Sequence, residues 1–230
     1  MTDRDHHSPR VRDVPAPRRS PSVIGPLFGK IFAWPYRLAL AGLYRARVHP
    51  LHLTLLSLLG NGVVAWLLTT RRFFLPGIFL VVAGLFDIFD GGLARLRGEA
   101  GRAGAFLDSV VDRVSDLIVF GALFWTLFEQ GKRPAAALAL SSLLFALLVS
   151  YVRAEAEAAS LTMTEGFMQR LERFVLLVIG LTVPGALLPV LIILTGLGAA
   201  TVVQRIGSAW LRLRGDSPET KESDKTGSSI

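Results

Sequence analysis

Apolar runs close to the length of a bilayer span recur along this chain, separated by short charged or glycine-containing segments. A helix needs about 20 predominantly apolar residues to cross the hydrocarbon core of a membrane, and 51% of the 230 residues are hydrophobic. Six runs are present, the fifth shorter than the others, at residues 51–70, 73–93, 104–127, 135–156, 174–183 and 187–206. The sequence therefore predicts an all-α integral membrane protein with six transmembrane helices.

The remaining segments extend this plan. We expect a disordered basic tail, an interfacial amphipathic helix, the six-helix domain and a polar C-terminal tail, at residues 1–21, 22–48, 49–212 and 213–230. The interfacial helix is predicted because Lys30 and Arg37 interrupt its apolar residues. Pro35 should kink or split that helix.

The distribution of charge predicts an orientation. The formal net charge is +7, and most Lys and Arg residues lie near the two termini and in the loops on one side of the six runs. Such flanks fit cytoplasmic ends and anionic lipid better than nucleic acid. We therefore expect both termini on the cytoplasmic face of a bacterial cytoplasmic membrane. The chain has no cysteine, which excludes disulfides and thiolate metal sites.

Four aspartates border the second and third runs. Asp87 and Asp90 are three residues apart, and Asp108 and Asp112 are four apart, so each pair lies on one helix face. Carboxylates at membrane depth are costly and are read as functional. Hard oxygen ligands suit Mg²⁺, Mn²⁺ or Ca²⁺, and four carboxylates could hold two ions. Two-metal sites favour displacement at phosphorus.

The residues around the aspartates suit a phosphate ligand. Gly91 and Gly92 follow Asp90 directly, and residues without a side chain allow a ligand or backbone to come close. Arg95 lies one turn beyond Gly91, where it could hold a diphosphate.

Two other interpretations are open. The acids could form an interfacial salt-bridge network with neighbouring arginines, or they could mark the pathway of a divalent-cation transporter. A pathway would place acids near mid-membrane, whereas these cluster at one face, in the cytoplasm-facing loop region. That position favours an enzyme.

The whole motif resembles a known family. It reads Asp87-x-x-Asp90-Gly91-x-x-Ala94-Arg95, eight residues, then Gly104-x-x-x-Asp108-x-x-x-Asp112. This is the signature of the CDP-alcohol phosphotransferases, also called CDP-alcohol phosphatidyltransferases, and the resemblance extends from about residue 33 to 214. It implies six transmembrane helices, an interfacial N-terminal helix and a homodimer. It also implies transfer of a phospho-alcohol group from a donor such as CDP-diacylglycerol to a polar acceptor hydroxyl, with release of CMP.

The resemblance implies roles for individual residues. The metal ligands, for two Mg²⁺ or Mn²⁺ ions, would be Asp87, Asp90, Asp108 and Asp112. Asp112 would also be the base for the acceptor hydroxyl, although a role as ligand alone is an alternative. The CDP-alcohol would be bound by Thr54, Gly91, Ala94, Arg95 and Gly104. One polar residue of the family is replaced here by Leu51. His49 and His52 are interpreted as interfacial side chains, and Asp116 as a buried polar partner.

The second half of the chain bears on the acceptor. Its residues 150–157, 170–173 and 204–205 resemble the phosphatidylinositol-phosphate synthase branch, where matching positions bind the phosphate of inositol phosphate. The acceptor-binding residues would be Ser150, Arg153, Arg173 and Arg205. Glu155 stands where the branch has arginine, and an acid there should oppose a phosphate. Glycerol 3-phosphate is therefore an alternative acceptor, and an alcohol without phosphate is another.

Overall fold

The computed structural model describes residues 33–162 and 169–215, and the described residues are all-helical. The helices are α2 (Ala33–Arg45), α3 (Pro50–Thr69), α4 (Phe74–Arg97), α5 (Arg102–Glu129), α6 (Arg133–Ala158), α7 (Arg170–Thr182) and α8 (Leu187–Gly215). The last six coincide with the six predicted runs to within a few residues at most ends. α8 is the exception, because it continues well past the predicted end at residue 206. The predicted tail at residues 1–21, the start of the interfacial helix and most of the C-terminal tail lie outside the described residues.

Within residues 33–162 and 169–215, four helices are long and apolar enough to cross a membrane: α3, α4, α6 and α8. α5 has 28 residues, but acidic and basic side chains interrupt its first half. α7 has 13 residues, which gives a helix of roughly 20 Å against a hydrocarbon core of about 30 Å. The chain is therefore an integral membrane protein, and four helices among the described residues have the length and hydropathy of membrane spans.

Glycines allow the helices to cross at short distance. A Cβ atom on Gly60 of α3 would lie 2.9 Å from the Cβ of Ala83 on α4, and one on Gly84 would lie 2.4 Å from the ring of Phe174 on α7. Small residues at such crossings let neighbouring backbones approach, which is how helices associate in membranes. α4 therefore packs against both α3 and α7.

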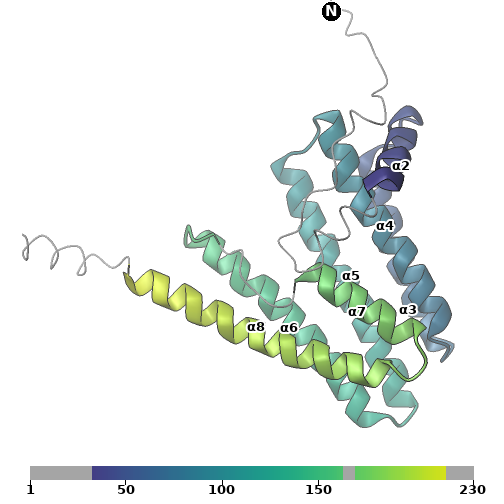
Figure 1. The fold of residues 1–230 in the computed structure, drawn as a ribbon, viewed down its shortest axis with the longest axis vertical. Coiled ribbons are helices and arrows are strands. Elements are labelled where there is room, and N and C mark those ends of the chain that lie inside the picture. Colours follow the sequence, from purple (N-terminus) through teal and green to yellow (C-terminus); the bar gives the residue numbers. More distant parts are fainter. Residues whose placement is uncertain (1–32, 163–168, 216–230) are drawn as a thin grey trace, which may run out of the picture.

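The main core fills the end of the bundle where the turns between α3 and α4, α5 and α6, and α7 and α8 lie (Figure 1). Its largest fully buried side chains are Leu68, Leu123, Leu127 and Leu191. Large apolar side chains also point outward: Trp66 is 66% exposed and Val203 is 71% exposed. Outward apolar side chains of this kind are expected of helices that face lipid.

A second, smaller core joins α2 to the end of α4. Tyr36 and Leu40 of α2 pack with Leu93 of α4, and the Tyr36 ring stacks on Phe89 at 5.6 Å between centroids. Pro35 lies in the first turn of the described helix, where a missing N–H removes no hydrogen bond. Residues 33–45 form one continuous helix, and the segment before residue 33, against which a kink or split at Pro35 would show, lies outside the described residues.

Candidate metal centre and adjoining cavity

Two helices that meet α3 carry the aspartates. Asp87 and Asp90 lie in the second half of α4, and Asp108 and Asp112 lie in the first half of α5. α4 ends at Gly98 in the left-handed conformation, with φ of 71°, which glycine adopts at little cost. The chain then re-enters a helix at residue 102. This short connection places both acidic pairs at the same end of the bundle.

Three of the carboxylates converge on one point. Single carboxylate oxygens of Asp87, Asp90 and Asp108 all lie within 4.8 Å of one another. Three hard oxygen donors at this separation fit a divalent ion such as Mg²⁺ or Mn²⁺. Asp112 lies outside this group of three. Its Oδ1 atom is buried and lies 2.7 Å from a guanidinium nitrogen of Arg170, with which it forms an ion pair.

Two donors hold the carboxylate of Asp90. The Thr54 hydroxyl of α3 donates to Oδ2 at 2.7 Å, and the backbone N–H of Gly91 donates to Oδ1. Asp90 is only 4% exposed, so these donors offset the cost of burying the charge. The sequence analysis placed Thr54 at the nucleotide, whereas in this structure its hydroxyl is directed at a predicted metal ligand.

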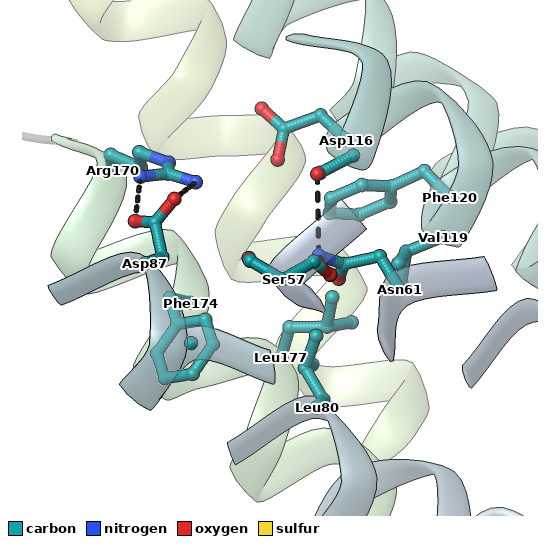
Figure 2. A pocket seen from close by; sticks show the side chains of 12 residues that line it. Ser57, Asn61, Leu80, Asp87, Asp116, Val119, Phe120, Arg170, Phe174 and Leu177 are labelled. Carbon is teal, nitrogen blue, oxygen red and sulfur yellow. Dashed lines mark hydrogen bonds and ion pairs between the residues drawn. The ribbon is translucent and has the colours of Figure 1, made fainter. Parts of the chain in front are cut away.

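Arg170 bridges α4 and α5 from the start of α7. Its guanidinium donates to Asp87 Oδ2 at 2.6 Å, and it forms an ion pair with Asp112 Oδ1 at 2.7 Å. Figure 2 shows the pairing with Asp87, with Phe174 on the far side of that carboxylate. The sequence analysis assigned no role to Arg170. The sequence did contain a signal for such a role, because Arg170 and Arg173 lie one helical turn apart and therefore share a helix face.

The predicted nucleotide-binding residues leave open space. A Cβ on Gly104 would meet no heavy atom within 4 Å, and one on Gly91 would meet only Arg95 Nη1, at 3.4 Å. Packing within the described chain therefore does not require glycine at either position, as expected where a ligand comes close. Arg95 is exposed and Ala94 is half-buried.

Arg95 also contacts the N-terminal helix. It hydrogen-bonds Tyr36 of α2; burial raises the pKa of the Tyr36 phenol, and the charge and hydrogen bond of Arg95 act in the opposite direction. The phenol therefore stays protonated at neutral pH. Arg95, which is predicted to bind the diphosphate, therefore also contacts α2, the helix that packs on the end of α4.

A cavity of about 560 Å³ adjoins the aspartates between α5, α6, α7 and α8. All four predicted acceptor residues line it, namely Ser150, Arg153, Arg173 and Arg205. Asp108 and Asp112 line the same cavity. The structure thus brings together two predictions made from separate parts of the chain, the carboxylate cluster and the basic pocket.

The arginines of this cavity are held by neighbouring groups. Arg173 donates to Asp116 at 3.1 Å; Asp116 is a polar partner as expected, but it is half-buried and not buried. Arg205 is 4% exposed and donates to the carbonyl oxygen of Val149 at 2.8 Å. Fixed guanidinium groups suit the binding of a phosphate dianion.

The expected position of Glu155 in the acceptor pocket is wrong. Glu155 is exposed, is not among the residues that line the cavity, and hydrogen-bonds Tyr151. The acid that lines the cavity is Glu157, which pairs with Arg153 at 2.8 Å. The reason is helical periodicity: positions 153 and 157 share a face, and position 155 points away from it.

The remaining polar residues have structural contacts. His49 is the N-cap of α3, and its Nδ1 accepts from the backbone N–H of Leu51 at 3.2 Å.

A cavity of about 40 Å³ lies between the aspartates and the main core. Asn61, which the sequence analysis did not mention, lines this cavity (Figure 2). Its side-chain amide donates to the Ser115 hydroxyl at 3.2 Å.

Comparison with known proteins identifies similar sequences and folds. A family model described as CDP-alcohol phosphatidyltransferase matches residues 47–206. The phosphatidylinositol phosphate synthase of Corynebacterium glutamicum is 35% identical over 189 residues, covering 79% of this chain and 84% of that protein. A crystal structure of Mycobacterium tuberculosis phosphatidylinositol phosphate synthase with CDP-DAG bound is similar at a TM-score of 0.69 and 32% identity, covering 75% of this chain and 92% of that one. A second crystal structure of that enzyme, in complex with manganese and citrate, also has a TM-score of 0.69 and 32% identity, over 75% of this chain and 87% of that one.

Proposed function

The chain belongs to the CDP-alcohol phosphatidyltransferase family, and we propose that it transfers the phosphatidyl group of CDP-diacylglycerol to a hydroxyl of inositol phosphate, releasing CMP. The chain is a transferase enzyme of phospholipid synthesis. One observation carries the choice of a phosphorylated acceptor: Asp108, Asp112 and the three arginines of the predicted acceptor pocket line a single cavity.

The aspartates supply the metal centre and the base. Asp87, Asp90 and Asp108 would hold the divalent cations, with Asp112 beside them, and we propose two ions, Mg²⁺ or Mn²⁺. When bound, such ions neutralise the diphosphate and the charge that develops on the leaving group. Thr54 and the Gly91 N–H keep the Asp90 carboxylate in position.

The transfer itself needs one proton acceptor and two oriented substrates. Asp112 takes the proton of the acceptor hydroxyl, whose oxygen forms a bond to the phosphorus that bears the diacylglycerol. The bond from that phosphorus to the oxygen of CMP breaks, and CMP leaves. Arg95 holds the diphosphate, while Arg153, Arg173 and Arg205 hold the acceptor phosphate.

We extend the proposal to the membrane arrangement. α4 ends at the aspartate-bearing end of the bundle and α6 begins at the other end (Figure 1), so α5 has to return the chain across the bundle. The same reasoning applies to α7, between α6 and α8. Six spans, an interfacial α2, and a cytoplasmic active site and termini follow from this plan and from the loop arginines. By the family likeness, we also propose a homodimer.

A divalent-cation transporter is the alternative of a different class. A transport pathway would continue from the carboxylates through the bundle. In the described residues, the far half of the bundle is occupied by fully buried side chains such as Leu68, Leu123 and Leu127. The geometry therefore favours chemistry at one face.

The test is an acceptor screen with purified protein. CDP-diacylglycerol and Mg²⁺ or Mn²⁺ are supplied with inositol phosphate, glycerol 3-phosphate or inositol, and CMP release is measured. We expect inositol phosphate to be the best acceptor, and Asp112→Asn to lose most of the activity while still eluting as a folded protein. Faster CMP release with glycerol 3-phosphate or inositol would refute the assigned acceptor. Equal CMP release by Asp112→Asn and wild type would refute the role of Asp112.

A further inference from the structure

Arg170 contacts two of the four aspartates and lines both cavities. Its guanidinium lies 2.6 Å from Asp87 Oδ2 and 2.7 Å from Asp112 Oδ1, and a second nitrogen reaches Asp87 Oδ1 at 3.5 Å. It lines the cavity of about 40 Å³ beneath the aspartates and the cavity of about 560 Å³ beside them. Arg170 therefore connects the candidate metal centre to the predicted acceptor pocket.

The guanidinium and a divalent cation would use the same carboxylate oxygens. Both oxygens of Asp87 face Arg170, yet Asp87 is also one of the three carboxylates whose oxygens lie within 4.8 Å of one another. A doubly charged ion among those oxygens would stand a few ångströms from the guanidinium. Like charges at that distance, partly removed from water, repel strongly. Cation binding and the present contacts of Arg170 therefore oppose each other.

The larger cavity offers Arg170 another position. Among the described residues, five arginines and four carboxylates line it, so its charges nearly balance. Divalent cations bound by Asp108 and Asp112 would neutralise the negative charges of these two carboxylates. The arginines would then make the electrostatic potential of the cavity positive. The Arg170 side chain is 42% exposed, so packing does not confine it, and Arg173 lies one turn away.

We propose that Arg170 couples the two substrate sites: divalent cations compete with its guanidinium for Asp87 and Asp112, and cation binding moves it into the larger cavity, where it binds the phosphate of the acceptor. This proposal rests on the proposed function and deepens it. Acceptor binding then depends on prior cation binding. Because the diphosphate of the donor itself binds the cations, the donor would bind before the acceptor.

The first test measures cation affinity without any reaction. Wild type, Arg170→Gln, Arg170→Lys and Arg113→Gln are purified in lipid nanodiscs and titrated with Mn²⁺, with free Mn²⁺ read by electron paramagnetic resonance. Arg113 is the matched control, because it lines the same cavity but hydrogen-bonds the backbone of its own helix at Ser109. We expect Arg170→Gln to bind Mn²⁺ about tenfold more tightly, the size of effect typical of coupling between two sites. Arg170→Lys should fall between Arg170→Gln and wild type, and Arg113→Gln should change the affinity much less.

The second test measures the binding of a dianion. Radiolabelled sulfate is titrated with and without saturating Mn²⁺. In wild type and in Arg113→Gln, Mn²⁺ should tighten sulfate binding about tenfold, whereas Arg170→Gln should lose most of this gain. The coupling is refuted if Arg170→Gln binds Mn²⁺ no more tightly than wild type, or if it keeps the full gain in sulfate affinity.

Two controls separate this proposal from folding and from the proposed function. Size-exclusion chromatography and thermal melting show whether Arg170→Gln is folded. If Arg170→Gln is misfolded, Arg170→Lys is used in its place. A Mn²⁺ affinity of Arg170→Lys equal to that of wild type then refutes the coupling. CMP release is measured on wild type alone. Transfer to an acceptor with unaltered Mn²⁺ affinity in the variants would contradict only the coupling. The expected Mn²⁺ and sulfate results without transfer to any acceptor would contradict only the proposed function.

Discussion

At the scale of single residues, Asp90 shows how this chain tolerates a charge inside a membrane protein. It is 4% exposed, and its two carboxylate oxygens receive a hydroxyl and a backbone N–H. Each donor lowers the cost of burial and fixes a rotamer. A carboxylate that is already oriented can bind a cation without first losing conformational freedom.

Thr54 should therefore influence cation binding without touching the cation. Thr54→Val removes the 2.7 Å hydrogen bond to Asp90, and loss of a hydrogen bond to a charged group costs about 1.5–3 kcal/mol. We expect Mn²⁺ affinity, measured by isothermal titration, to fall at least about tenfold. Thr54→Ser keeps the hydroxyl and should stay close to wild type. Equal affinities in all three proteins would show that Asp90 does not depend on this contact.

The two glutamates of α6 should behave differently towards the acceptor. Glu157→Gln frees Arg153 from its 2.8 Å ion pair inside the cavity, so KM for inositol phosphate should fall several-fold. Glu155→Gln alters a side chain outside the cavity lining and should leave KM unchanged. Steady-state CMP release at varied acceptor concentration measures both. A fall in KM for Glu155→Gln but not for Glu157→Gln would show that Glu155, and not Glu157, lies in the acceptor pocket.

The sequence was sufficient to predict the aspartates but not their partners. The spacing of Asp87, Asp90, Asp108 and Asp112 encodes two helix faces, and local periodicity is readable from sequence alone. The contact of Arg170 with Asp87 joins positions 83 apart, and no local pattern reports such a distance. The prediction that Glu155 lies in the acceptor pocket failed for a related reason. It was based on matching positions in a family motif, which does not show which face of α6 lines the cavity.

At the scale of helices, glycines divide into those that permit packing and those that leave space. Gly84 lies against the ring of Phe174, whereas Gly104 and Gly121 have no heavy atom within 4 Å of an added Cβ. The sequence predicted a ligand role for Gly104 because it belongs to the motif. It could not predict the packing role of Gly84, because that depends on how α4 and α7 cross.

Alanine substitutions should separate these roles. Gly84→Ala forces the Phe174 ring to move and should destabilise the protein by about 1–3 kcal/mol, lowering the melting temperature in detergent. Gly121→Ala, in open space on α5, should leave the melting temperature unchanged or raise it slightly. Gly104→Ala should melt like Gly121→Ala but raise KM for CDP-diacylglycerol. An unchanged KM would indicate that the nucleotide does not approach Gly104.

At the scale of the whole molecule, hydrophobic patterning placed the helices within a few residues at most ends, because each spanning segment must satisfy its own backbone in lipid. Patterning also predicted α5 and α7 as spans, but neither is among the described helices that are long and apolar enough to cross a membrane. Charged side chains of the site lie within α5, and α7 has only 13 residues. In α5, the charged side chains that belong to the site also weaken the hydrophobic signal, whereas α7 is simply shorter than a membrane span.

The six-span arrangement predicts an alternating pattern of accessibility. The chain has no cysteine, so single cysteines can be introduced at Arg72, Lys132, Gly185, Glu99 and Leu161. A membrane-impermeant maleimide on intact cells should label the first three, in the turns at the end remote from the aspartates, and should label the last two only after lysis. Labelling of Lys132 only after lysis would show that α5 does not cross, and the same result at Gly185 would show that α7 does not.

The most direct test of the central claim is the mass of the lipid product. Purified protein is incubated with CDP-diacylglycerol, Mg²⁺ and inositol phosphate, and the lipid fraction is analysed by mass spectrometry. We predict a diacylglycerol lipid that carries one phosphodiester and one phosphomonoester on inositol, formed in equal amount with CMP and absent when EDTA removes the cation. Phosphatidic acid as the only lipid product, or formation of the lipid product in EDTA, would contradict this account of the aspartates and the arginine-lined cavity.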